Sequence, residues 1–118
     1  MYSINGDGSR RYTKILRDGV LLEGWKVCHF FVDVEGCCNA DVDKICGTLD
    51  TIIIKGIYLI VGAGAFENTK VFVQDEMLRG VQSIEGLICE DEPPELTIHT
   101  LMLPNIVEIG EEECLKLG

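Results

Sequence analysis

Two glycines stand in the one stretch of this chain that suggests nucleotide chemistry. Residues 55–66 read KGIYLIVGAGAF, an apolar run that leads into Gly62 and Gly64. A dinucleotide loop of the G-x-G-x-x-G type opens a helix, whose N-terminus receives the pyrophosphate. Here the third small residue would fall at Glu67, whose carboxylate repels phosphate, and the following TKVFV is typical of a strand. We therefore interpret Gly62 and Gly64 as residues of a tight turn. The alternative is a small nucleotide-binding or enzymatic domain that uses this loop.

The cysteines are the next residues that could do chemistry. No C-x₂-C pair, the usual ligand spacing of structural zinc, occurs in the sequence. We interpret Cys89 and Cys114 as core residues, and the others as small buried hydrophobes, with a disulfide among the first four left open. The six cysteines are Cys28, Cys37, Cys38, Cys46, Cys89 and Cys114.

Acid–base chemistry has few candidates. His29 and His99 are the only histidines, and no Ser-His-Asp or Cys-His arrangement can be argued around them. The adjacent carboxylates of Glu111, Glu112 and Glu113 favour solvent over paired acid–base work. The sequence therefore predicts a protein that is not an enzyme, with no metal and no cofactor.

Composition limits the partners and the architecture. The chain has 118 residues, 47% of them apolar, which suits one folded domain rich in strands. Its formal charge of −10 argues against nucleic acid, which needs a positive face. No signal peptide or membrane-spanning stretch is visible. The compartment stays unknown: cytoplasmic or, if the chain is a fragment, the cell surface.

An apolar pattern recurs along the second part of the chain. Leu78 follows Ile54 by 24 residues, and Leu103 follows Leu78 by 25. Each segment has a strand, a turn, a second extended piece, a glycine and a compact turn. Units that cannot bury an apolar edge alone stack into a solenoid. The aligned positions are Leu49, Ile54, Ile57, Ile60 and Phe66; Val73, Leu78, Val81, Ile84 and Cys89; and Ile98, Leu103, Ile106, Ile109 and Cys114.

These segments resemble a known repeat family. LTIHTLMLPNIVEIGEEECLKLG and VGAGAFENTKVFV are similar to leucine-rich repeats of the BspA type, over residues 48–118. Leu103-Pro104, Val107 and Ile109-Gly110 fit the first part of that pattern, and residues 64–68 fit the second. The resemblance implies a curved stack that binds other macromolecules without catalysis, commonly in surface or adhesion proteins.

The predicted fold is thus an α/β repeat, a β-rich right-handed solenoid of short strands with small helical turns. Residues 1–47 are expected to form an N-terminal cap or degenerate repeats, including a hairpin at Asp18-Gly19, and residues 48–118 three stacked repeats. The predicted function is a structural or protein-binding module, with self-association possible through an open C-terminal end. Strand residues out of phase with the core form the candidate binding face: Asp50, Phe72, Gln74, Thr97 and His99.

Overall fold

A computed structural model of the chain describes residues 1–56, 58–100, 106–110 and 116–117, with side chains described up to residue 100. The described chain consists almost wholly of strands, and its helical structure is the single-turn 3₁₀ helix η1 (Phe66–Asn68). The strands are β1 (Tyr2–Gly6), β2 (Lys14–Arg17), β3 (Val20–Leu21), β4 (Val27–Asp33), β5 (Cys38–Val42), β6 (Ile45–Ile54), β7 (Tyr58–Gly62), β8 (Lys70–Val73), β9 (Glu76–Met77), β10 (Val81–Cys89), β11 (Glu95–Thr100), β12 (Ile106–Gly110) and β13 (Lys116–Leu117).

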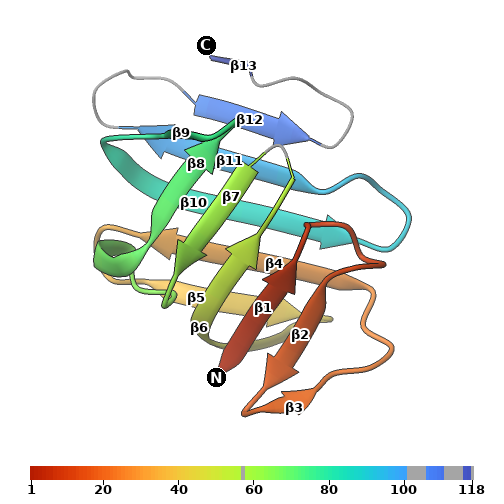
Figure 1. Cartoon of the computed structure of the whole chain (residues 1–118). Coiled ribbons are helices and arrows are strands. Elements are labelled where there is room, and N and C mark those ends of the chain that lie inside the picture. The colour runs from red at the N-terminus through yellow and green to blue at the C-terminus, as the bar shows by residue number, and fades with distance from the viewer. Residues whose placement is uncertain (57, 101–105, 111–115, 118) are drawn as a thin grey trace.

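The strands form two layers that share β6. Sheet A has the order β3-β2-β1-β6-β7-β8-β9, and sheet B has the order β6-β5-β4-β10-β11-β12-β13. The first residues of β6 pair with β5, while its later residues pair with β1 on one side and β7 on the other. Sheet A therefore lies in front of sheet B, and the strands of the two sheets cross steeply (Figure 1).

A bulge lets β6 pass from one sheet to the other. Tyr2 pairs with Leu49 but the next residue, Ser3, pairs with Thr51, so Asp50 has no partner on β1. An extra residue of this kind bends a strand and increases its twist. The bend takes β6 out of sheet B and into sheet A, which folds the strand network over itself.

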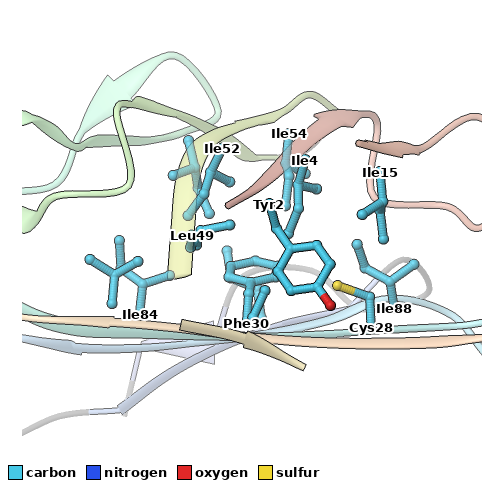
Figure 2. Close-up of a cluster of buried hydrophobic side chains, with 14 of the residues drawn as sticks. Tyr2, Ile4, Ile15, Cys28, Phe30, Leu49, Ile52, Ile54, Ile84 and Ile88 are labelled. Atoms are coloured by element: carbon cyan, nitrogen blue, oxygen red, sulfur yellow. The ribbon is translucent and has the colours of Figure 1, made fainter. Parts of the chain in front are cut away.

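Alternating side chains fill the space between the layers. In the longer strands β4, β7 and β10, buried residues alternate with more exposed neighbours, as the pleat of a strand dictates. Figure 2 shows Ile4, Ile52 and Ile54 pointing from sheet A toward Phe30 and Ile84 of sheet B. The fully buried large side chains are Tyr2, Ile4, Ile15, Phe30, Ile52, Ile54, Ile60, Ile84, Ile88, Leu96 and Ile98.

The chain contains two copies of one local structure, 56 residues apart. We call residues 2–24 the first unit and residues 58–80 the second unit. The sequence Y-x-I-x-G-x-G begins both units, and T-K and L-x-G recur at matching positions. The backbone repeats as well: Leu22 N donates to Ile15 O at 2.9 Å, and Leu78 N donates to Val71 O at 2.9 Å. The left-handed turn residues correspond too: Asp18 (φ 51°) and Gly19 (φ 81°) with Gln74 (φ 50°) and Asp75 (φ 68°).

An approximate two-fold axis relates the two units. In sheet A, β1 runs parallel to β6 and β7 antiparallel to it, with Ile4 opposite Ile52 and Ile60 opposite Ile54. Ile53 is therefore the centre of the arrangement. In sheet B, Phe30 on β4 stands opposite Gly86 on β10, and these two residues are also 56 apart.

The side chains at the sheet B end of this axis cannot be identical. A Cβ added at Gly86 would collide with the ring of Phe30. Two phenylalanines at these positions would need the same space. One large ring and one glycine fill this space without overlap, so the two-fold symmetry is broken at the axis.

The predicted solenoid of α/β repeats is wrong. The described chain is a mixed β-structure that measures 38 × 30 × 22 Å, without the helical turns of a solenoid. The 24-residue spacing recurs because each strand alternates apolar residues, not because the segments share a layer: Ile60 lies in sheet A and Ile84 in sheet B. The expected boundary after residue 47 falls inside β6, and residues on both sides of it form one core. Ile57, Leu103 and Cys114 lie outside the described residues.

Candidate functional site

Gly62 and Gly64 pack closely against the backbone of neighbouring segments. Gly64 has a φ of +77°, and a Cβ there would collide with the carbonyl oxygen of Leu49 and lie 2.8 Å from that of Asp50. Carbonyl oxygens repel phosphate. The element that follows is η1, a single turn leading into β8, so residues 58–73 form no strand–loop–helix phosphate site.

The predicted binding residues do not gather on one face. Phe72 points outward from β8 in sheet A, whereas Thr97 and His99 point outward from β11 in sheet B, on the opposite side of the molecule. Asp50 is the exposed bulge residue of β6, and Gln74 is exposed in the turn after β8. We predicted a single binding face because a solenoid has one strand face, whereas this fold has two outer sheet faces.

The outer face of sheet A is apolar with two lysines. Its outward positions that pair across strands carry no Asp or Glu among the described residues, although the exposed bulge residue Asp50 adjoins the outward Thr51 on β6. Met77 is 45% exposed and Val61 41%. No described element covers this face, which turns toward the viewer in Figure 1. The outward residues are Ser3, Asn5, Lys14, Leu16, Leu21, Thr51, Ile53, Leu59, Val61, Lys70, Phe72 and Met77.

The outer face of sheet B carries the opposite charge. The outward positions of the described strands β4, β5, β6, β10 and β11 hold four carboxylates, two histidines and no Lys or Arg. His29 Nε2 lies 3.3 Å from Glu85 Oε1. The outward residues are Val27, His29, Phe31, Asp33, Asn39, Asp41, Cys46, Thr48, Ser83, Glu85, Leu87, Cys89, Glu95, Thr97 and His99.

A hollow of about 290 Å³ opens at one end of the sheet B face. Val27, His29, Asp41, Asp43 and Lys44 line it. The Asp43 carboxylate is engaged, since it accepts hydrogen bonds from the amides of residues 26 and 27 at 3.0–3.1 Å. Asp41 Oδ1, by contrast, is buried without a hydrogen-bond partner in the part of the chain that is described. A buried carboxylate oxygen without a hydrogen bond leaves its desolvation cost uncompensated.

The cysteines differ widely in exposure. Cys28 is buried in the core, as predicted, and burial raises the pKa of its thiol to about 12. Burial also raises the pKa of Cys38 and of Cys89. Cys89 points outward from β10 and is half-buried, so its assignment to the core is wrong. The five described cysteines are unpaired, and no three metal-capable side chains cluster among the described residues.

The basic residues near the start of the chain split into two roles. The Arg10 guanidinium stacks 4.0 Å from the centre of the buried Trp25 ring, and its Nε donates to Trp25 O at 2.6 Å. Arg10 therefore braces a loop. Lys14 instead stands exposed on the outer face of sheet A.

Comparison with known proteins finds no relative: no family model, curated protein or solved structure matches the chain. The resemblance to BspA-type repeats stays a prediction. Among the described residues no helix has the length and hydropathy to cross a bilayer.

Sequence reasoning missed the lysine pair of the sheet A face. Lys14 and Lys70 follow Thr13 and Thr69 and lie 56 residues apart, at matching positions of the two units. A search for self-similarity at longer spacings would have found them.

Proposed function

We propose that this chain is a non-catalytic protein-binding or structural module that works through the outer faces of its sheets. The observation that carries the proposal is the outer face of sheet A, where half-buried Phe72 and Leu59 lie beside exposed Val61 and Met77 and no described element covers them. Contiguous apolar surface of this kind marks interaction sites on soluble domains.

The chemistry of the face fits a protein better than a small molecule. A sheet face is broad and only shallowly contoured, whereas small-molecule sites are concave and bury most of their ligand. Aromatic and methionine side chains are enriched where proteins meet. Phe72 and Met77 stand opposite each other on β8 and β9, which makes them the natural centre of such a contact.

The test compares a face variant with a matched control. We expect the double variant Phe72→Ser/Met77→Ser, immobilised and exposed to an extract of its source cells, to lose a protein that the unaltered chain retains. The control Tyr12→Ser/Val34→Ser removes exposed apolar side chains away from both faces and should retain it. Equal recovery by all three chains would refute the role of the face.

A second measurement addresses catalysis at the glycine loop. Nucleotides should leave the melting temperature of the chain unchanged, because backbone occupies the space beside Gly62 and Gly64. A nucleotide-dependent rise in melting temperature that Gly62→Ala abolishes would favour the enzymatic alternative.

A further inference from the structure

The two outer faces of the molecule are complementary to each other. The sheet A face presents Lys14 and Lys70 among apolar side chains. The sheet B face presents Asp41, Glu85 and Glu95 around the apolar Phe31 and Leu87. The faces lie on opposite sides of the core, so one copy cannot bring its own two faces together (Figure 1).

The lysines are placed symmetrically. They occupy equivalent positions of the two units, on either side of Ile53 at the approximate axis. The same axis passes through sheet B between Phe30 and Gly86. Both outer faces are therefore centred on one line through the molecule, and copies placed along that line present one face to the next.

The sheet B face supplies carboxylates for an ammonium group. Glu85 and Glu95 are exposed there, whereas the hollow beside Asp41 is also lined by Lys44, whose own ammonium disfavours a second one. A lysine reaches such a site with its charged end while its aliphatic stem covers apolar surface. Charge-assisted hydrogen bonds of this type are stronger than neutral ones.

We propose that the partner of the sheet A face is the sheet B face of a second copy of this chain. The proposal rests on the proposed function, and it names the partner. Stacking sheet A on sheet A would bring lysines against lysines, and sheet B on sheet B carboxylates against carboxylates. Sheet A on sheet B pairs opposite charges over two apolar centres. Because the two surfaces differ, the contact is heterologous and continues from copy to copy unless the rotation closes a ring.

Charge reversal on each face separates this contact from any other self-association. The A variant is Lys14→Glu/Lys70→Glu, and the B variant is Glu85→Lys/Glu95→Lys. Sedimentation of the purified full chain at 0.15 M salt should show a mass that grows with concentration. Each variant alone should raise the dissociation constant at least tenfold, because like charges then face each other.

The decisive step is to mix the two variants. The reversed sheet A face of one variant is complementary to the reversed sheet B face of the other, so an equimolar mixture should regain the assembly that each has lost. Matched controls make the same charge changes at exposed positions outside the strands: Arg11→Glu/Arg79→Glu for the A variant and Glu23→Lys/Glu67→Lys for the B variant. These should assemble like the unaltered chain, and circular dichroism checks that every variant is folded.

Three outcomes would overturn the inference: a monomer at every concentration, equal losses in face variants and controls, or no recovery on mixing. A monomer that still retains a different protein through Phe72 and Met77 refutes self-stacking and leaves the proposed function standing. A monomer for which the face substitutions change no recovery from the extract refutes both.

Discussion

The first and second units share most of their inner side chains and, apart from Lys14 and Lys70, differ on the outer face of sheet A. Tyr2 and Ile4 recur as Tyr58 and Ile60, and all four are buried. On the outer face Ser3, Asn5 and Leu16 correspond to Leu59, Val61 and Phe72. The comparison teaches that the core and the left-handed turns fix the shape of a unit, whereas its outward positions are open to other uses. The second unit supplies most of the apolar surface of sheet A.

The largest predicted effect lies at the approximate two-fold axis, where β4 carries Phe30 and β10 carries Gly86 at equivalent positions. Phe30→Ala removes a fully buried ring from beside Gly86 and should lower the free energy of unfolding by about 3–5 kcal/mol. Gly86→Ala forces a methyl group into that ring and should cost about 1–3 kcal/mol. Urea denaturation measures both.

A swap tests the axis itself. The double variant Phe30→Gly/Gly86→Phe moves the ring to the equivalent strand position, and it should be more stable than Phe30→Gly alone. If Phe30→Gly/Gly86→Phe is less stable than Phe30→Gly, a ring on β10 cannot fill the space that the ring on β4 leaves. The two positions are then not equivalent in packing.

Gly8 and Gly64 allow a second comparison within one pair. Both have positive φ, 91° and 77°, so an alanine costs about 1–2 kcal/mol of strain at either position. A Cβ at Gly64 also collides with the carbonyl oxygen of Leu49, whereas one at Gly8 lies 3.0 Å from the Tyr58 hydroxyl, a side-chain atom. We therefore expect Gly64→Ala to destabilise more than Gly8→Ala by about 1–3 kcal/mol in thermal or urea unfolding. Equal losses would contradict the tighter packing of the second unit.

Local structure was predictable from the sequence, but its assembly was not. The Asp18-Gly19 hairpin is present as β2–β3, and the strand indicated by TKVFV is present as β8. Alternation shows that a strand has a buried side, but it does not show which sheet buries it. The passage of β6 between sheets depends on a bulge at Asp50 that forms only when β1 pairs with it.

For the same reason, the sequence did not show that the predicted binding residues lie on separate faces. Phe72 and His99 are both outward, as predicted, yet they belong to opposite faces. The repeat of turn glycines was the sequence signal for the two units. Gly8 and Gly24 match Gly64 and Gly80, and all four have positive φ.

Cys28 and Ile84 are equivalent core positions of which only one can ionise. Burial raises the pKa of Cys28 from 9.0 to about 12, so its thiol stabilises the fold below pH 9 and that contribution is lost as pH rises from 9 to 12. At pH 10 the loss is on the order of 1 kcal/mol. The fall in unfolding free energy between pH 8 and pH 10 should be smaller by this amount in Cys28→Ala, measured with urea. An unchanged fall in Cys28→Ala would refute the buried thiol.

The turns of the two units give the smallest expected difference. Asp18 Oδ1 lies 2.8 Å from the N-terminal ammonium, which lowers the pKa of that carboxyl, while the equivalent Gln74 has no charge. A lowered pKa stabilises above the ordinary value of 3.8 and is lost as pH falls through the lower folded value. Because both groups are exposed, Asp18→Asn should shift the urea midpoint at pH 7 less than Gly8→Ala does, and the shift should shrink in high salt. An N-terminal extension that moves the ammonium away should reproduce the shift. A shift as large as that of Gly8→Ala, or one insensitive to salt, would mean that Asp18 acts through its left-handed backbone and not through its charge.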